Sequence, residues 1–259
     1  MNRTELERKL SSLPLSAFRY FYTIGSTNDE ALAWASQGAP DFSLVIANEQ
    51  TSGRGRMDRK WFTPPDAALA MSLILRPTAV EHAHLSRMTG LLALSLAESL
   101  LQLGLAPQIK WPNDVLLSGR KVAGILVESS WMGESLDAMV LGMGVNVLKA
   151  AVPPTDQLLF PATSIETELG RPIERGDLLK EILARALKWH PKLGTDAFLK
   201  AWDQYLAFRG QQVQVEGRSE GPIKGKVLGL ESDGSLRLQD NHGRSVTVRF
   251  GEVHLRPLT

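Results

Sequence analysis

The sequence predicts an α/β (α+β) fold: a mixed, largely antiparallel sheet with flanking helices, followed by a small C-terminal β-barrel. Two observations lead to this class. Apolar residues alternate in some stretches and recur with helical spacing in others, without the regular strand–helix–strand order of a parallel sheet. Beyond Gly210 the pattern changes to short alternating strands. A chain of 259 residues is therefore expected to divide into a large domain, residues 1–208, and a small one, residues 209–259.

The N-terminal segment is expected to form two helices and three strands. Thr4 and Glu7 have the spacing of a capping box for the first helix. Apolar residues alternate over 18–24, which predicts a strand, and Ser26 or Thr27 can cap the helix that follows. Two further apolar stretches predict buried strands, at residues 43–47 and 69–75.

The central segment continues with strands and helices in separate runs. The expected helices cover residues 80–103, 176–190 and 196–208, and the expected strands cover residues 108–111, 115–117, 122–128 and 138–147. Ser118-Gly119-Arg120 supplies the turn of a hairpin. The strand 138–147 is considered as an exposed edge able to pair two subunits, which leaves a homodimer as an option.

The C-terminal segment predicts a module of short strands. These strand patterns lie near residues 213–215, 227–230, 236–238 and 246–250. Asp233-Gly234 and residues 241–243 supply turn chemistry between them. A sheet this small buries little core, so closure into a barrel, which removes the sheet edges, is expected.

Composition excludes several classes of function. Twenty-nine Lys and Arg against 28 Asp and Glu leave a net charge of +1, too little for a protein that binds nucleic acid through its overall field. The absence of cysteine excludes disulfides, thiolate metal sites and cysteine nucleophiles, and it fits a cytoplasmic location. No histidine-based zinc motif occurs, and no apolar run predicts a signal peptide or a membrane span.

The most unusual stretch is GRGRMDRKW, residues 53–61, which holds four cationic side chains and one carboxylate. Guanidinium groups match phosphate and carboxylate oxygens bidentately, and the glycines allow a close approach of the backbone to a ligand. The stretch therefore predicts a loop that binds a polyanion. The alternatives are a solvated charged turn and an RNA-binding Arg/Gly segment. Neither explains the Trp61-Phe62 pair that follows directly, although a core anchor would.

Two other stretches combine turn chemistry with polar side chains. KWPND, residues 110–114, ends a short strand, where a proline and an Asx turn aim side chains outward. Lys121 lies on the second strand of the hairpin, where a lysine is most often a solvated edge residue. Gly142 and Gly144 precede Asn146 but lack the third glycine and the helix of a dinucleotide fingerprint. Alternating glycines instead leave room for a flat group against the backbone.

Taken together, four ordered blocks resemble the signature of biotin protein ligases. The blocks are GSTNDEA at 25–31, ANEQTSGRGRMDRKWFTPP at 47–65, KWPNDVLLSGRKVAGILVE at 110–128 and GMGVNV at 142–147. The resemblance implies a catalytic domain like that of class II aminoacyl-tRNA synthetases and an SH3-like C-terminal barrel. It also implies an enzyme that activates biotin with ATP and Mg²⁺ as biotinyl-5'-AMP. The biotin then passes to a lysine of a biotin carboxyl carrier domain, and no tightly bound prosthetic group is implied.

The resemblance carries residue roles onto the matching positions. The basic loop corresponds to a segment that folds over the acyl adenylate, and Lys121 and Arg56 are implied as the catalytic pair. The implied biotin-binding residues are Ser26, Thr27, Asn28, Gln50, Gly53, Arg54, Gly55, Arg56, Lys121, Gly124 and Leu126. The implied nucleotide-binding residues are Arg54, Arg56, Arg59, Trp61, Lys121 and Asn146. Asp114 is a candidate to take the amine proton in the transfer step, and no metal-ligating side chain is implied.

The chain departs from the family pattern at two places. Met57-Asp58 stands where many relatives carry a basic residue and a glycine, so loop closure is expected to differ. The segment before the first strand is too short for the helix-turn-helix domain of some relatives, so neither DNA binding nor transcriptional repression is predicted. Two rival functions remain: a lipoate or octanoate ligase or transferase of the same architecture, and a small RNA-binding protein, against which the near-neutral charge weighs.

Overall fold

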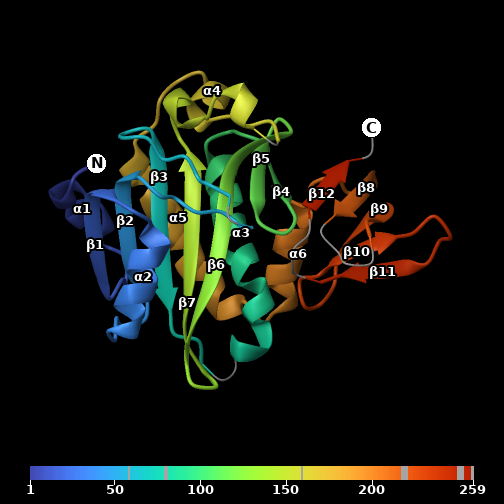
Figure 1. Ribbon diagram of the computed structural model, residues 1–259, viewed down its shortest axis with the longest axis horizontal. Helices are drawn as coiled ribbons and strands as arrows, with labels where there is room; N and C mark the ends of the chain where they lie inside the picture. Colours follow the sequence, from blue (N-terminus) through green and yellow to red (C-terminus); the bar gives the residue numbers. More distant parts are fainter. Residues whose placement is uncertain (58, 79–80, 159, 217–220, 250–253, 258–259) are drawn as a thin grey trace.

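A computed structural model describes the chain except for residues 58, 79–80, 159, 217–220, 250–253 and 258–259 (Figure 1). Its large sheet has seven strands in the order β1-β2-β3-β7-β6-β5-β4. These strands are β1 (Ala17–Ile24), β2 (Ser43–Gln50), β3 (Ala68–Leu75), β4 (Pro107–Lys110), β5 (Asp114–Leu117), β6 (Arg120–Met132) and β7 (Ser135–Asn146). Only the β1–β2 pair is parallel. The expected mixed, largely antiparallel sheet is confirmed.

Helices cover both faces of this sheet. Side chains alternate along its strands, so the apolar strands present residues that need burial on both faces. On β2, Leu44 and Ile46 join the main core, whereas Val45 between them faces the other way and packs with Ala31 and Ala35. Figure 1 shows α2 in front of the sheet and α3 and α5 behind it. The α-helices are α1 (Arg3–Leu10), α2 (Thr27–Ser36), α3 (Met88–Gln102), α4 (Ile165–Leu169), α5 (Arg175–Trp189) and α6 (Asp196–Gln204). None of the helices described here is long and apolar enough to cross a membrane.

The helix starts differ from the sequence prediction at two places. The α1 cap is Asn2, whose side chain accepts a hydrogen bond from the Glu5 backbone, so the Thr4–Glu7 capping box was wrong. The α3 helix begins at Met88 rather than near residue 80, which lies outside the described residues. A 3₁₀ segment, η1 (Glu81–Arg87), with non-helical dihedrals at His84 precedes α3.

The end of one helix and the position of one strand were also predicted wrongly. The α6 helix ends at Gln204 rather than at 208, because residues 205–207 turn to run along the edge of β4 through hydrogen bonds with the Ile109 backbone. The strand expected as an exposed edge is β7, which lies between β3 and β6 in the interior of the sheet. Both its sides are paired over residues 139–145, so this part of β7 is not an exposed edge.

The C-terminal sheet has five strands in the order β11-β10-β9-β8-β12. They are β8 (Gln212–Glu216), β9 (Ile223–Leu230), β10 (Leu236–Gln239), β11 (Ser245–Val248) and β12 (His254–Pro257). The last strand, like α4, was not predicted. No ladder joins β11 to β12 within the described residues, so closure into a barrel stays a prediction. Phe250, which was expected to extend β11, lies outside those residues.

Backbone carbonyls in the turn between β9 and β10 attach this sheet to the large one. The Trp111 indole donates to Gly234 O at 3.1 Å, and the buried Arg87 guanidinium donates to Ser232 O and to Leu193 O. Gly234 has φ +84°, and a Cβ added to it would lie 2.8 Å from the Trp202 ring, so a side chain there would be both strained and obstructed. The small sheet therefore braces the strand that leads into KWPND.

Candidate active site

A cleft of about 690 Å³ lies on the large sheet, and every residue named above for biotin, nucleotide or catalysis lines it. Its walls come from the N-terminus of α2, the segment between β2 and β3, the β4–β6 region and the end of β7. These segments are far apart in the chain, and the sheet order brings them together. Within the described residues no group of three His, Cys, Asp or Glu side chains could form a metal site.

The described parts of the basic stretch, residues 50–57 and 59–63, form two paired arms, which we call the basic hairpin. Antiparallel bridges pair Gln50 with Thr63 and Arg54 with Lys60. Trp61 N donates to Gly53 O at 2.8 Å. A Cβ on Gly53 would lie 2.4 Å from the Trp61 carbonyl oxygen, so only glycine allows the two arms to approach this closely.

Two paired glycines form a flat floor for the indole of Trp61. Gly124 of β6 and Gly144 of β7 are register partners. A Cβ on Gly144 would lie 2.1 Å from the Trp61 Nε1 atom, and one on Gly124 would lie 3.2 Å from the same ring. Of the two alternating glycines that were expected to leave room for a flat group, Gly144 faces the Trp61 ring, whereas Gly142 faces the Asn28 side chain. The Trp61 indole N–H is buried without a hydrogen-bond partner among the described residues.

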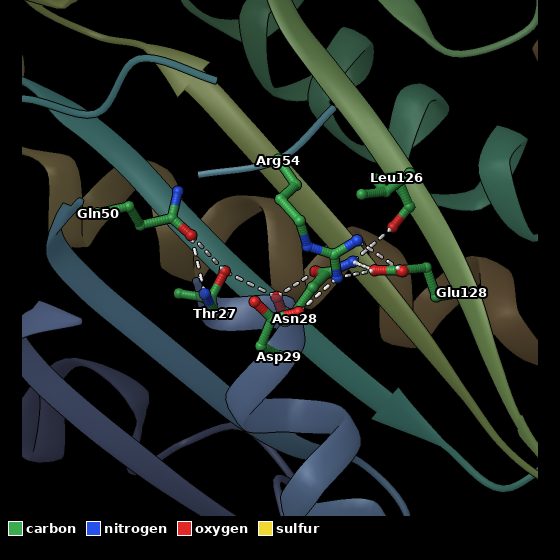
Figure 2. Close-up of polar contacts among 8 residues, drawn as sticks. Thr27, Asn28, Asp29, Gln50, Arg54, Leu126 and Glu128 are labelled. Atoms are coloured by element: carbon green, nitrogen blue, oxygen red, sulfur yellow. Dashed lines mark hydrogen bonds and ion pairs between the residues drawn. The ribbon is translucent and has the colours of Figure 1, made fainter. Parts of the chain in front are cut away.

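One end of the cleft, which we call the neutral end, is built from uncharged polar side chains. Gln50 Oε1 accepts from the Thr27 backbone N at 2.8 Å and from Thr27 Oγ1 at 3.1 Å. Ser72 Oγ lies 2.8 Å from Thr27 Oγ1 and 2.6 Å from Asn28 Oδ1. Ser72 was not predicted as a site residue, although a serine inside the apolar strand 69–75 was a visible signal. Figure 2 shows Thr27 and Gln50 facing each other.

Arg54 closes the neutral end by an ion-pair network. Its guanidinium donates to both Glu128 oxygens at 2.9 and 2.8 Å and to Asp29 at 2.6 Å (Figure 2). The hydrogen bond to Glu128 is the main cause that raises the pKa of Arg54. Asn28 Nδ2 donates to Glu128 at 2.7 Å and to Leu126 O at 3.2 Å. Two carboxylates thus more than offset the single charge of Arg54, and the amide group of Asn28 donates to protein acceptors.

The opposite end, which we call the cationic end, is organised around Asp114. The Lys121 ammonium lies 2.6 Å from Asp114 Oδ1, and the Lys110 ammonium lies 3.5 Å from Oδ2. Lys110 also lies 4.1 Å from the centroid of the Phe160 ring. Burial alone would raise the pKa of Asp114, but the two ammonium groups outweigh it and hold the pKa below its ordinary value. Asp114 therefore stays ionised at neutral pH.

The remaining predicted residues border the cationic end. Lys121 is 26% exposed, and its backbone is paired with β5 on one side and with Ala162 on the other, so the interpretation as a solvated edge lysine was wrong. Its ammonium lies 5.4 Å from the Trp61 ring centroid. Arg56 donates to Asn113 Oδ1 at 3.2 Å, and Asn146 donates to Thr163 O at 3.1 Å. Cationic and amide groups thus converge where the hairpin meets β6 and β7.

The chain matches two family descriptions. Residues 20–146 match the Biotin/lipoate A/B protein ligase family, and residues 208–256 match the Biotin protein ligase C terminal domain. Three relatives are similar along most of the chain. The biotin--[acetyl-CoA-carboxylase] ligase of Paracoccus denitrificans is 36% identical over 85% of this chain and 93% of its own. The enzyme of the same name from Mycobacterium tuberculosis is 35% identical, with 90% and 86% covered. The bifunctional ligase/repressor BirA of Bacillus subtilis is 32% identical, with 86% and 70% covered.

A solved structure shows the same arrangement. The biotin protein ligase of Aquifex aeolicus, in complex with biotin and ATP, superposes with a TM-score of 0.81 at 27% identity. The match covers 94% of this chain and 100% of that one. The similarity therefore includes both sheets.

Proposed function

The chain belongs to the biotin protein ligase family, and we propose that its cleft carries out both half-reactions of such an enzyme. In the first, a biotin carboxylate oxygen attacks the α-phosphorus of ATP, and pyrophosphate leaves. In the second, a lysine amine of a carrier domain attacks the acyl carbon, AMP leaves and the amine loses a proton. The supporting observation is that Lys121, held by Asp114, and Arg56 share one cleft with Thr27 and Gln50, and that the buried Ser72 lies behind Thr27.

The two ends of the cleft suit the two parts of the first reaction. The neutral end offers uncharged donors and acceptors together with the apolar wall of Leu126, which suits the uncharged ring system of biotin. The cationic end would receive the carboxylate and the phosphates. Trp61 and Asn146 lie on the same side as Lys121, which supports their proposed contacts with the nucleotide.

The first half-reaction brings together two anions, so their repulsion must be offset. Lys121 and Arg56 would stabilise the charge that develops on the phosphoryl oxygens. Lys110, which the sequence prediction did not include, adds a third positive charge beside Asp114. Mg²⁺ would accompany the phosphates of ATP and add charge there. Mg²⁺ bound to phosphates usually keeps several waters, so it would not need a cage of protein ligands.

Asp114 suits the positioning of Lys121 better than the acceptance of a proton. A carboxylate whose pKa lies below its ordinary value is a weak base. Its ion pair with Lys121 instead fixes the ammonium at the floor of the cleft. Asp114 would accept the proton of the carrier lysine only after phosphate oxygens draw the two ammonium groups away from it.

The basic hairpin would cover the acyl adenylate until the carrier domain arrives. A mixed anhydride is hydrolysed by water, so a cover that excludes solvent raises the yield of transfer. Arg54 ties the hairpin to β6 and α2 through its ion pairs with Glu128 and Asp29. Met57 stands at its tip with φ +57°, a conformation that glycine would adopt more readily. Cytoplasmic location and the absence of DNA binding stay predictions, and so does a homodimer.

Pyrophosphate release tests this proposal. Purified protein with Mg-ATP is given biotin, lipoate or octanoate in parallel, and a biotin carrier domain is added last. We expect release with biotin alone, followed by a biotin-sized mass gain on one carrier lysine. Pyrophosphate release with only lipoate or octanoate would mean that this acid, and not biotin, is the substrate. If none of the three acids caused pyrophosphate release, the proposed function would be wrong.

A further inference from the structure

The backbone of Lys121 is held by a segment that the sequence motifs did not single out. The β6–β7 ladder begins at the pair Ala123–Val145, so β7 does not reach Lys121. Residues 160–163, which we call the strap, take its place beside β6. Lys121 N donates to Pro161 O at 2.7 Å, and Thr163 N donates to Lys121 O at 2.9 Å, as in a parallel bridge. Both the backbone N–H and the backbone carbonyl of Lys121 are thus hydrogen-bonded to the strap.

The strap also forms the wall of the cationic end. Phe160 and Ala162 line the cleft, and the Phe160 ring packs against the Lys110 ammonium. The carbonyl of Thr163 receives the Asn146 amide. A shift of the strap would therefore move the surroundings of both lysines and of Asn146, but it would leave Thr27, Gln50 and Ser72 in place.

One carboxylate outside the cleft fastens the strap to the β5–β6 turn. Glu168 of α4 accepts from Thr163 Oγ1 at 2.6 Å, from Ser118 Oγ at 2.8 Å and from Arg120 Nη2 at 2.6 Å. Its side chain is only 9% exposed. Burial alone would raise the pKa of Glu168, but the hydrogen bonds from Thr163 and Ser118 and the charge of Arg120 outweigh it and lower the pKa. The carboxylate thus stays charged and fully engaged at neutral pH.

From this geometry we infer that Glu168 is a positioning residue for Lys121: it locks the strap to the turn that precedes Lys121, and so sets the cationic end of the cleft without touching substrate. Arg120 is the chain neighbour of Lys121, and Thr163 binds the Lys121 carbonyl. Glu168 therefore fixes the lysine backbone from both sides. The kinetic part of this inference rests on the proposed ligase function.

Glu168→Gln keeps the size of the side chain and removes its charge. Thr163→Val removes only the hydrogen bond from Thr163 Oγ1 to Glu168. Asp137→Asn is the matched control, because Asp137 forms a 2.6 Å ion pair with Arg76 and is also largely buried, but lies away from the cleft. We expect Glu168→Gln to lower kcat/KM for ATP about tenfold in biotin-dependent pyrophosphate release. Biotin affinity without ATP should change less than about twofold, because the neutral end is untouched. Thr163→Val should act in the same direction with about a threefold loss.

Hydrogen exchange of the free protein tests the structural part without any catalysis. The amides of Lys121 and Thr163 should exchange about tenfold faster in Glu168→Gln than in the wild type or in Asp137→Asn. Unchanged exchange at these amides would overturn the inference. Equal losses in kcat/KM for ATP and in biotin affinity would also overturn it. If wild-type protein releases no pyrophosphate with any acid, the proposed function fails, while the exchange result still decides whether Glu168 positions Lys121.

Discussion

The two ends of the cleft differ in how their polar groups are balanced. At the neutral end Thr27 is hydrogen-bonded to Gln50 and to Ser72, and the carboxylates of Glu128 and Asp29 more than offset the charge of Arg54. At the cationic end the ammonium groups of Lys110 and Lys121 share the carboxylate of Asp114, and the Arg56 guanidinium lines the same cleft. The neutral end is therefore suited to recognise a substrate, and the cationic end is suited to change it. Substitutions at the two ends should separate binding from chemistry.

The largest kinetic separation is expected for Lys121→Ala. Loss of an ammonium aimed at developing charge costs about 3 to 4 kcal/mol of transition-state stabilisation, which lowers pyrophosphate release about 10²- to 10³-fold. Biotin affinity should fall far less, because the neutral end keeps its contacts. Both quantities can be measured beside Lys200→Ala, an exposed lysine of α6. Equal losses in binding and release would contradict the division of the cleft.

Asp114→Asn should destabilise the protein by about 3 kcal/mol at pH 7, because it leaves Lys110 and Lys121 without their shared counter-ion. The pKa of Asp114 is lowered on folding, so its contribution is complete above the ordinary value of 3.8 and is lost as the pH falls through the lower folded pKa. Urea unfolding of both proteins should therefore give the same difference at pH 7 and pH 5. A difference that shrinks over this interval would mean a raised pKa and would favour Asp114 as a general base.

Arg56→Gly should leave a folded protein that releases its adenylate about tenfold faster, because one charge-assisted contact of the hairpin is lost while the Arg54 network stays. Mass spectrometry of a filtrate measures the free adenylate. Lys60→Gly adds the same backbone freedom to the hairpin and keeps Arg56, so it is the appropriate comparison. Retention as tight as in the wild type would mean that Arg56 does not hold the cover.

Ser72→Ala should have the smallest effect and should act at the neutral end alone. Removal of its hydroxyl leaves Thr27 and Asn28 each short of one partner, which should weaken biotin binding about fivefold to tenfold. The turnover number at saturating biotin should not change. Ser99→Ala removes another buried serine hydroxyl, on α3, and should leave biotin affinity as it is. A loss of turnover in Ser72→Ala would show that the two ends are coupled.

Sequence patterns predicted those parts of the fold that depend on local periodicity. The alternation in residues 18–24 and 69–75 located β1 and β3, and Ser118-Gly119 marked the hairpin, where both residues have positive φ. The five-residue helix α4 was missed because it is too short to show a helical period. The start of α3 was misplaced because its apolar pattern extends into η1.

The site was predicted where its residues lie within motifs and was missed where tertiary register makes the contact. All the predicted residues line one cleft, although their individual roles stay proposals. Glu128 and Asp29 stood inside the quoted blocks, but nothing local shows that they neutralise Arg54 across the cleft. The Gly124–Gly144 pair exists only in the register of β6 with β7. Glu168 reaches Arg120 from 48 residues away, a distance that no local pattern spans.

Trp61 gives the protein an optical property of its own. Within the described part of the chain it is the one tryptophan that lines the cleft, and it lies against two glycines and near the Lys121 ammonium. Indole fluorescence responds to nearby charge and to solvent exposure, so binding of a ligand in the cleft should change the emission wavelength and intensity of Trp61. Occupancy of the cleft could then be followed in real time with an unlabelled protein.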